Sequence, residues 1–498
     1  MRKFFELGFL HLILFLFFSP WVQCSAAFLP PPPTTLKDVD GDNLNDACIE
    51  TPKLRVIFSS RTGNISLYYL KGVNFEENLI PPQIQDKGYL FASSTINPFE
   101  VVLGANDSEQ TLTPAGYNIV FDESPSNGDF VVVATANSPA AGVGLTKRYS
   151  FKLNSYTFGI EAIVSNLTEK SQIFGNEKLG NSGLKMQYGP GIFLEPFDNA
   201  SLIALKKDLL LPFETLEDLS KQVKDQSNSF TGIGLKTIYF CLLLEATSPG
   251  KLSLQKFEVK SNNPREPAFQ GEVLGISYPP FSLKSKESKS FSFNCYFGPK
   301  LLDELKLINR ELVTDYGFLS TMLLRILQFF YSIYPNYGMS IIFLTIFVRL
   351  LLYPLTIKST KSMAKVQKIQ PLVQDLKDRY RDNTQKFNEE VLKLYQKHQV
   401  NPLGGCLPIF LQLPVFIALY NTIHIAVELR KTSFLWISDL SKTDPLLILP
   451  ITIAILMYYQ QTKMNAPPEQ QQMMSFMVYK QHYRRCSADS SQQSHVGD

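Results

Sequence analysis

The sequence predicts a polytopic α-helical membrane protein that carries a large exported all-β domain and a cytoplasmic helical hairpin. Three observations support this fold class. Short runs rich in β-branched and aromatic residues recur through residues 49–300, apolar stretches gather near the C-terminus, and a basic segment separates two of those stretches. The chain average of 45% hydrophobic residues and a mean hydropathy of −0.03 therefore combines two unlike parts.

The overall charge and the cysteine content exclude several classes of protein. The 48 Lys and Arg residues exceed the 45 Asp and Glu residues by only three. This balance excludes a strongly basic nucleic-acid-binding protein and a highly charged disordered chain. Six Cys in 498 residues also exclude a disulfide scaffold. We therefore expect no specific nucleic acid among the partners.

The chain begins with the features of a secretory signal sequence. Arg2 and Lys3 precede an apolar run from Leu7 to Phe18, and Ser25–Ala27 resembles a cleavage site. The run is shorter than the roughly 20 residues that cross a bilayer. Residues 1–27 are therefore predicted to be either a signal peptide or an uncleaved N-terminal anchor. In both cases the following chain is exported, and the proline-rich residues 28–48 form a linker.

Residues 49–300 are predicted to form one large antiparallel β domain of the sandwich type. Its apolar runs, such as Leu54–Phe58 and Phe158–Val164, are separated by clusters of Gly, Asn, Ser and Pro. None of the five His residues lies between Ile49 and Gly298, and this range has neither a metal-ligand spacing nor a glycine-rich phosphate loop. We predict no catalytic residue, no cofactor and no metal, and hence no enzyme. An exported carbohydrate-binding β domain on a membrane anchor is the alternative.

Residues 301–337 are predicted to lead into the membrane, with an amphipathic helix at the bilayer interface. Leu301, Leu305, Ile308 and Leu312 recur at helical spacing, and charged residues occupy the other faces. A helix packed on the β domain would show the same spacing. The position of the segment directly before the first internal apolar stretch favours the interface.

Three apolar segments are predicted to cross the membrane: residues 338–356, 407–428 and 446–460. Between the first two, Lys358–Lys397 holds ten Lys and Arg against five Asp and Glu, so its net charge is +5 and the rest of the chain sums to −2. The positive-inside rule places this basic segment in the cytoplasm, opposite the exported β domain. Residues 429–445 then lie outside, and residues 461–498 form a cytoplasmic tail.

The basic segment belongs to a predicted antiparallel helical hairpin, residues 357–406. Each half carries an apolar stripe at helical spacing, which burial against the other half would stabilise. The stripes are Ile369, Leu372, Val373, Leu376 and Tyr380, and then Phe387, Val391, Leu394, Tyr395 and His398. Asp382-Asn383 between them is typical of a turn. The basic outer faces would contact anionic lipid, nascent chains or the ribosome, or act only as a solvated face that fixes the topology.

An ordered series of short motifs extends from about Phe297 to Met477. The motifs are Asp315-Tyr316-Gly317, Val348–Thr356, Ser362–Lys365, Gln370-Pro371, Asn401–Cys406, Gln412–Phe416, Leu429-Arg430, Trp436-Ile437, Asp439-Leu440, Asp444-Pro445 and Ile448–Pro450. In this order and at this spacing they resemble the YidC-type membrane protein insertases, the YidC/Oxa/Alb family. The β domain matches mainly by its position and character.

The resemblance implies a fold, a function and a location. The β domain would be a periplasmic domain of supersandwich-like fold in a multi-pass protein of the bacterial cell inner membrane. The protein would insert inner-membrane proteins and help them fold through a hydrophilic intramembrane groove, alone or with the Sec translocon, and without a cofactor. The implied partners are nascent membrane proteins, the Sec translocon, membrane lipid, and the ribosome through the basic hairpin.

The resemblance also places three residues in the groove that contacts the substrate. They are Arg349, Thr345 one turn earlier, and Gln412 at the matching polar position of the next span. The residues support this placement independently, because a charge within an apolar span normally faces a polar cavity. Arginine keeps its proton in proteins and so supplies a fixed positive charge. Since Lys358 follows nine residues later, snorkelling of Arg349 to the cytoplasmic headgroups is the alternative.

The chain departs from the family pattern after Met477. The family continues into two further apolar spans, whereas residues 478–498 are polar and rich in Ser and Gln. The sequence therefore resembles a C-terminally truncated or frameshifted member, which we expect to be unstable or inactive unless another polypeptide completes it. A genuine short paralogue is the alternative.

Overall fold

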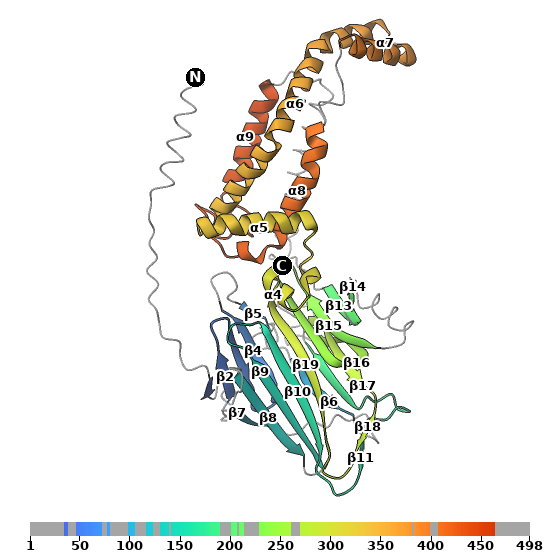
Figure 1. Ribbon diagram of the computed structural model, residues 1–498, viewed down its shortest axis with the longest axis vertical. Coiled ribbons are helices and arrows are strands. Elements are labelled where there is room, and N and C mark those ends of the chain that lie inside the picture. The colour runs from blue at the N-terminus through green and yellow to red at the C-terminus, as the bar shows by residue number, and fades with distance from the viewer. Residues whose placement is uncertain are drawn as a thin grey trace, which may run out of the picture. The chain divides into compact units, whose positions relative to one another are not determined.

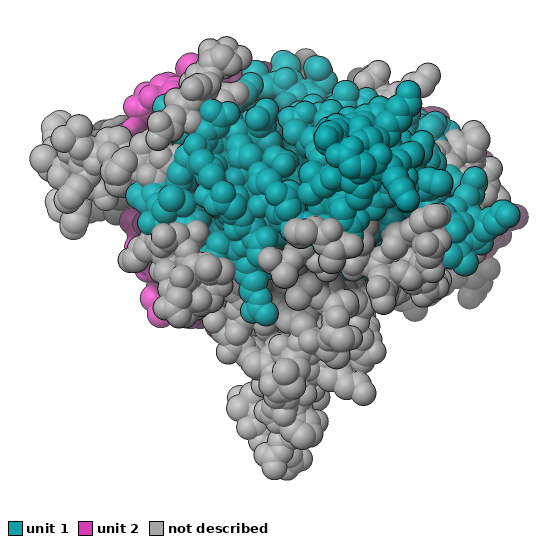
Figure 2. All heavy atoms as spheres, turned by 90° about the horizontal axis from the view of Figure 1, so that it is seen from below, with its two compact units in different colours: residues 1–315 teal, residues 316–498 magenta. Residues whose placement is uncertain are grey.

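The computed structural model describes residues 34–37, 46–71, 77–79, 98–104, 116–122, 130–138, 141–189, 201–206, 209–213, 229–259, 269–380, 383–398 and 407–463. The chain divides into two compact units, residues 1–315 and 316–498. The described strands belong to the first unit and the long helices to the second (Figure 1), and Figure 2 colours the two units separately. The predicted signal peptide or anchor and the divergent residues 478–498 lie outside the described residues.

A five-stranded antiparallel sheet in the first unit follows the order of the chain. Its strands are β1 (Thr34–Lys37), β2 (Asp46–Glu50), β3 (Leu54–Phe58), β4 (Ile65–Leu70) and β5 (Glu77–Asn78). The inward side chains of this sheet are apolar, and Val56, Tyr68 and Leu70 are fully buried. This sheet therefore contributes one wall of the core of the domain.

The second sheet has twelve strands. Nine lie in the spatial order β14 (Leu209–Phe213), β13 (Ser201–Lys206), β15 (Phe230–Lys236), β16 (Phe240–Val259), β19 (Ser288–Pro299), β10 (Thr157–Asn166), β9 (Val143–Phe151), β8 (Phe130–Ser138) and β7 (Asn118–Asp122). The other three continue from β16 in the order β17 (Phe269–Tyr278), β12 (Leu184–Tyr188) and β6 (Glu100–Leu103). A separate pair joins β11 (Gln172–Phe174) to β18 (Phe281–Leu283).

The 20-residue strand β16 belongs to both branches of this sheet. Its first part, Phe240–Ala246, pairs with β19, and its second part, Lys251–Val259, pairs with β17. Along β10, half-buried and buried residues alternate without a break, which directs one face of the strand into the core. There the rings of Phe151 and Phe158 stack with their centroids 4.7 Å apart. The prediction of a large antiparallel β domain is confirmed.

The junction segment, Leu301–Asp315, ends the first unit and differs from the expected amphipathic helix. Helix α4 covers only Leu302–Leu307, and a 3₁₀ turn, η1, covers Glu311–Thr314. Between them Asn309 has a left-handed φ of 56°, which ends the helix. The single helical stripe predicted from Leu301 to Leu312 is therefore wrong, because Leu305 is fully buried whereas Leu312 is 73% exposed.

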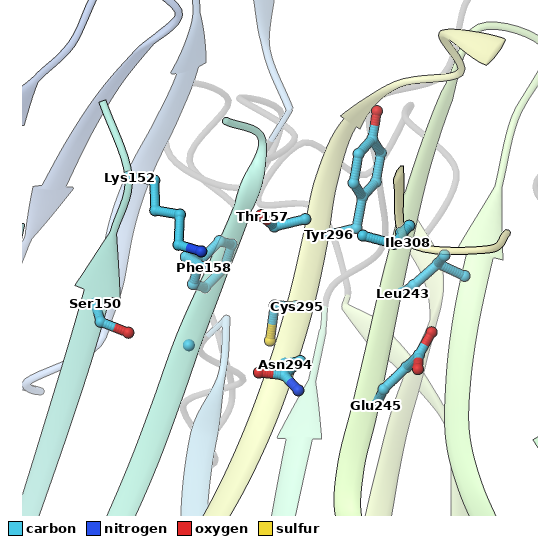
Figure 3. A pocket seen from close by; sticks show the side chains of 11 residues that line it. Ser150, Lys152, Thr157, Phe158, Leu243, Glu245, Asn294, Cys295, Tyr296 and Ile308 are labelled. Atoms are coloured by element: carbon cyan, nitrogen blue, oxygen red, sulfur yellow. The ribbon is translucent and has the colours of Figure 1, made fainter. Parts of the chain in front are cut away.

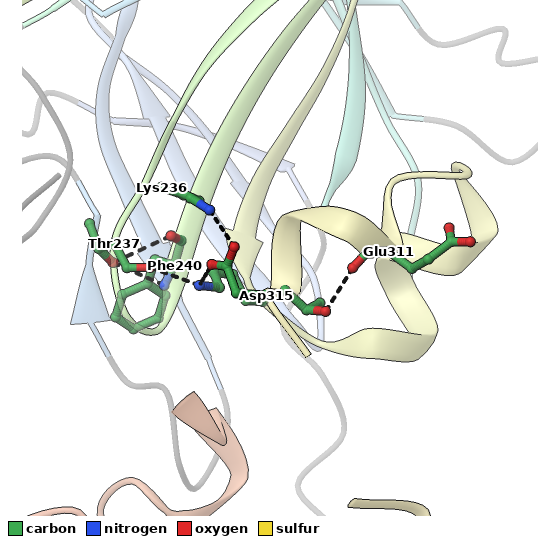
Figure 4. A network of polar contacts seen from close by, with 7 residues as sticks. Lys236, Thr237, Phe240, Glu311 and Asp315 are labelled. Atoms are coloured by element: carbon green, nitrogen blue, oxygen red, sulfur yellow. Dashed lines mark hydrogen bonds and ion pairs between the residues drawn. The ribbon is translucent and has the colours of Figure 1, made fainter. Parts of the chain in front are cut away.

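Two lysines hold the last residue of the junction segment (Figure 4). Lys236 Nζ lies 2.5 Å from Asp315 Oδ1, and Lys300 Nζ lies 3.3 Å from Asp315 Oδ2. Lys300 also donates to the backbone carbonyl of Thr237 at 3.0 Å. Burial lowers the pKa of Lys300, and the Asp315 carboxylate opposes this effect. The Asp315 carboxylate therefore neutralises the positive charge of Lys300, which would otherwise be buried without a counter-charge.

Replacing Asp315 with Asn is expected to loosen the junction segment. The change leaves the buried Lys300 ammonium without its carboxylate, and the cost is about 1 to 2 kcal/mol because Asp315 is itself 45% exposed and partly screened by solvent. Hydrogen exchange of the amides in Glu311–Asp315 should become faster. Glu311→Gln, at an exposed neighbouring carboxylate, serves as the matched control, and equal exchange in the two variants would contradict the role given to Asp315.

The second unit is helical. Its elements are α5 (Phe318–Ile333), α6 (Tyr337–Arg379), α7 (Thr384–Lys397), α8 (Leu407–Ile425), the 3₁₀ turn η3 (Val427–Leu429) and α9 (Ile448–Lys463). Helix α5 packs on α6 and α8 through a buried face that includes Leu323, Leu324 and Leu327. Ser320 Oγ donates to the Ala418 carbonyl at 3.2 Å, and Thr422 Oγ1 donates to the Ser320 carbonyl at 3.2 Å. These two hydrogen bonds fix α5 against α8.

Helix α6 is continuous through the first predicted span and the first half of the predicted hairpin. It contains Pro354 and Pro371 and still forms one element of 43 residues. Asn383, which belongs to the predicted turn, accepts a hydrogen bond from Lys386 N through its side chain and so caps α7. None of the described side chains of α7 is buried, so the two halves pack less closely than expected.

By length and composition, one described helical stretch, Tyr337–Val366, is long and apolar enough to cross a membrane. The apolar helices Phe318–Ile333 and Ile448–Gln460 are shorter. The described residues of α9 lie almost entirely at the surface of the unit, with Ile453, Ile455 and Tyr458 between 56% and 71% exposed. Such exposure of apolar side chains around a helix is typical of a lipid-facing element.

Gly338, near the start of α6, touches the ring of Phe434. A Cβ at this position would lie 2.2 Å from Phe434 Cγ. Gly338→Ala is therefore expected to displace Phe434 and to destabilise the second unit by about 1 to 3 kcal/mol. The backbone bonds between Phe434 and Ile437, at 2.8 and 2.9 Å, provide the readout, because their hydrogen exchange should become faster. Gly317→Ala is the control, since a Cβ there meets nothing within 4 Å.

Candidate functional site

A polar stripe follows one exposed face of α6. At about 100° per residue, Thr345, Arg349, Thr356 and Thr360 fall within an arc of about 60°, and the stripe is about 22 Å long. All four residues are exposed. The buried residues of this helix, Tyr337, Ser340 and Leu344 among them, lie on a different face, where α5 packs. Four polar side chains thus line an exposed face of α6, whose stretch Tyr337–Val366 is long and apolar enough to cross a membrane.

The three threonines of the stripe are satisfied within the helix. Each hydroxyl donates to the carbonyl four residues earlier, Thr345 to Ile341 at 2.8 Å, Thr356 to Leu352 at 2.9 Å and Thr360 to Thr356 at 2.8 Å. This bonding lowers the cost of a hydroxyl in apolar surroundings. Among the described residues no carboxylate pairs with Arg349. The guanidinium is therefore the strongest polar group of the stripe.

Gln412 lies on α8 at a similar height. Helix α5 contacts the start of α6, where the rings of Tyr331 and Tyr337 stack 4.0 Å apart. It also contacts the last turns of α8, at Thr422. At 1.5 Å per residue, Arg349 is about 18 Å along α6 from Tyr337, and Gln412 is about 15 Å along α8 from Thr422. Figure 1 shows both helices extending from α5 in the same direction.

The structure therefore brings together part of the predicted site. Thr345 and Arg349 share a face of α6, and α6 contacts α8. Gln412 is half-buried at a matching height, but the described contacts include no hydrogen bond between it and either α6 residue. Thr356 and Thr360 were not predicted as site residues, although their spacing from Arg349 was sufficient to identify them.

The β domain has a separate cavity of about 360 Å³ on the outer face of its large sheet (Figure 3). Its floor is a cross-strand row in which Gly159 pairs with Ser150 on one side and with Asn294 on the other, and Asn294 pairs with Glu245. Because Gly159 has no side chain, it opens a gap in the middle of the row. Lys152 adds a cation at the edge.

Glu245 is the one carboxylate that lines this cavity. Its two oxygens accept hydrogen bonds from Arg310 Nε at 2.7 Å and Arg310 Nη2 at 3.0 Å. Both oxygens of Glu245 are therefore engaged in a bidentate ion pair and are not free for a ligand. Conversion of a sugar normally needs a second carboxylate within reach. The residues that line this cavity include no such pair of carboxylates.

A buried lysine was also missed by the sequence reasoning. Lys147 is fully buried on β9, and burial lowers its pKa from the ordinary 10.5 to about 7. Its ammonium donates to Asn64 Oδ1 at 2.5 Å and to the Thr62 carbonyl at 3.3 Å, and it lies 4.7 Å from the centre of the Tyr117 ring. It therefore ties the turn between β3 and β4 to the large sheet and has no access to a substrate.

Comparison with known proteins covers almost the whole described chain. The family model for the YidC periplasmic domain matches residues 47–329, and the model for the 60Kd inner membrane protein matches residues 329–481. The two matched ranges share residue 329, which lies within α5. The first match covers the β domain and the junction segment, and the second covers the helices that carry the polar stripe.

Named relatives match over most of their length. The membrane protein insertase YidC of Geobacter metallireducens is 31% identical over 479 residues, which are 91% of this chain and 83% of that protein. The membrane protein insertase YidC of Geotalea uraniireducens is 29% identical over 449 residues, 87% of this chain and 80% of that protein. A crystal structure of an active YidC insertase aligns with 88% of this chain and 86% of that chain, at 19% identity and a TM-score of 0.32.

Proposed function

Since the chain belongs to the YidC family of membrane protein insertases, inner-membrane proteins with a periplasmic domain, we propose that it inserts other proteins into the inner membrane along the polar stripe of α6. In this proposal α6, α8 and α9 cross the membrane, and the β domain lies in the periplasm. Thr345, Arg349 and Gln412 line a hydrophilic groove that receives the polar part of the substrate, and Thr356 and Thr360 extend it.

The observation that carries this proposal is the exposure of Arg349 on an apolar helix. Tyr337–Val366 is apolar enough to lie in a membrane, and a fixed charge exposed on such a helix is costly unless it faces water or a polar chain. A water-filled groove resolves this conflict, because it keeps Arg349 hydrated. The aligned threonines provide a polar path of about 22 Å on the same face.

The groove needs no catalytic group and no cofactor. A hydrated path shortens the hydrocarbon distance that the polar tail of a substrate must cross, and Arg349 attracts acidic residues in that tail. The driving free energy comes from the apolar segment of the substrate, which gains about 25 cal/mol for each Å² removed from water. The protein lowers the barrier to this transfer.

Helix α5 is proposed to lie at the periplasmic surface of the bilayer. Its buried face packs on α6 and α8, and its other face exposes Phe318, Phe329 and Ile333, which are 89%, 60% and 64% exposed. Arg325 lies on the exposed side as well. An apolar face with a single cation is typical of an interfacial helix.

The basic segment Lys358–Lys397 is proposed to contact the ribosome, nascent chains and anionic lipid in the cytoplasm. Its net charge of +5 lies on the last part of α6 and on α7, and none of the described side chains of α7 is buried. Interactions of such exposed charges weaken as salt screens them. Ribosome binding should therefore decrease with ionic strength. Cooperation with the Sec translocon is proposed from the family alone.

Reconstitution tests the proposed function. The purified chain is placed in liposomes without other proteins and supplied with a single-span substrate that has a short acidic N-terminal tail. Protection of that tail from added protease should exceed the protection in empty liposomes. Equal protection in both would refute autonomous insertion, and protection that requires added Sec translocon would limit the proposal to a cooperating role.

A further inference from the structure

The junction segment, Leu301–Asp315, presents two leucines that its own packing does not explain. Leu307 is 81% exposed and Leu312 is 73% exposed, more than any other leucine that the structure describes. Single exposed leucines are ordinary on a protein surface. Two of them at these exposures, one at the end of α4 and one in the η1 turn, give a short segment a pair of unpartnered apolar groups.

The rest of the junction segment is bound firmly to the β domain. Leu302, Leu305 and Val313 are buried, with exposed fractions of 7%, 0% and 0%. Ion pairs join the segment to four residues of the β domain: Lys53 to Glu304 at 2.5 Å, Glu245 to Arg310 at 2.7 Å, and Lys236 and Lys300 to Asp315 at 2.5 and 3.3 Å. These buried side chains and ion pairs hold the backbone that carries Leu307 and Leu312 against the β domain.

We propose that Leu307 and Leu312 form a membrane-docking pair that seats the β domain on the surface of the bilayer. This inference rests on the proposed function, which places α5 at that surface. Leu312 precedes Phe318, the first residue of α5, by six positions, and six residues of extended chain reach at most about 22 Å. The short chain between Leu312 and Phe318 therefore keeps the pair close to the lipid that α5 contacts in this proposal.

Exposed charges flank both leucines, Lys306 beside Leu307 and Glu311 beside Leu312. Of these, the basic Lys306 favours anionic lipid, whereas Glu311 faces the aqueous side of the headgroup layer in this proposal. Apolar side chains enter the boundary between headgroups and acyl chains to a depth of about 5 to 10 Å. Docking of both leucines would leave the β domain oriented by the membrane as well as by the chain that follows it.

Fluorescence quenching by brominated lipid tests the docking pair. Leu307→Trp and Leu312→Trp are made separately in the full chain with Trp21→Phe and Trp436→Phe, because these are its two native tryptophans. The variants are reconstituted in liposomes whose lipids carry bromine near the start of the acyl chains. Phe329→Trp in α5 is the reference for an interfacial position. Leu179→Trp, at a 52% exposed leucine after β11, is the matched control.

If the docking pair enters the lipid, tryptophans at positions 307 and 312 should be quenched and show blue-shifted emission. Both effects should approach those at position 329 and exceed those at position 179. Strong quenching at 329 together with quenching at 307 and 312 no greater than at 179 would overturn the docking pair and leave the proposed function intact. Absence of quenching at 329 would overturn the placement of α5, and with it both the proposed seating of the domain and this part of the proposed function.

Discussion

Replacing Arg349 with Ala is expected to lower the insertion of a single-span substrate by about tenfold or more, whereas Arg349→Lys keeps most of the activity. The reason is electrostatic. A unit charge at about 8 Å from an acidic group, with an effective dielectric constant of about 20, contributes about 2 kcal/mol. A difference of this size in a barrier changes a rate by more than a factor of ten. Protease protection of the substrate tail in reconstituted liposomes measures the effect.

The comparison of Ala and Lys separates charge from shape. If Lys preserves insertion, a positive charge in the groove is sufficient and the planar guanidinium is not required. Leu351→Ala is the matched control, because Leu351 is 64% exposed on the opposite side of α6. Similar losses for Arg349→Ala and Leu351→Ala would mean that any truncation of α6 weakens insertion, and the polar stripe would then have no specific role.

The stability of the β domain is expected to rise with pH between about 7 and 9 because of Lys147, before the buried thiols of Cys241 and Cys295, whose pKa values burial raises, begin to oppose the effect. Burial lowers the pKa of Lys147 to about 7 in the folded protein, whereas the unfolded chain has the ordinary 10.5. In this window the unfolded chain binds more protons than the folded one, so the free energy of unfolding increases with pH, by up to about 1.4 kcal/mol per pH unit. Below pH 7 both states are protonated and the effect is constant.

Urea unfolding of the full chain in detergent measures this slope. Near-ultraviolet circular dichroism follows the buried tyrosines, and between pH 7 and 9 the free energy of unfolding should rise by about 2 kcal/mol. Lys147→Met should reduce the slope strongly. Lys185 and Lys300, whose pKa values burial also lowers, keep a remaining slope of the same sign. Arg148→Met, at the next and exposed position of β9, should leave the slope unchanged. An unaltered slope in Lys147→Met would show that other groups control the pH dependence.

Local sequence patterns predicted the strands and helices that are marked by a single clear repeat of apolar or polar residues. The apolar run Phe158–Val164 lies within β10, and Asn383, the second residue of the expected turn, caps α7. The face shared by Thr345 and Arg349 also followed from their spacing of four residues, since that spacing is one helical turn. These features need no information about distant parts of the chain.

Features set by distant contacts could not be predicted in the same way. The spacing of Leu301, Leu305, Ile308 and Leu312 is helical, but the bond of Arg310 to Glu245, 65 residues earlier, accompanies a break in the helix. Lys147 occupies an inward position of β9 that its apolar neighbours Leu145 and Tyr149 define, and only the turn at Asn64 explains why an amine fits there. The cavity beside Gly159 likewise needs the register of four strands.

The position of β19 at the end of the β domain also determines when the domain can fold. Thr157 of β10 pairs with Tyr296 of β19, 139 positions later in the chain. At about 5 to 20 residues per second, synthesis needs about 7 to 28 s to cover this distance. During that interval β10 has an unpaired edge, which is a template for wrong pairing with other chains. Nascent chains that stop before β19 should therefore be the most prone to aggregation and to proteolysis, and a holding chaperone would act in this interval.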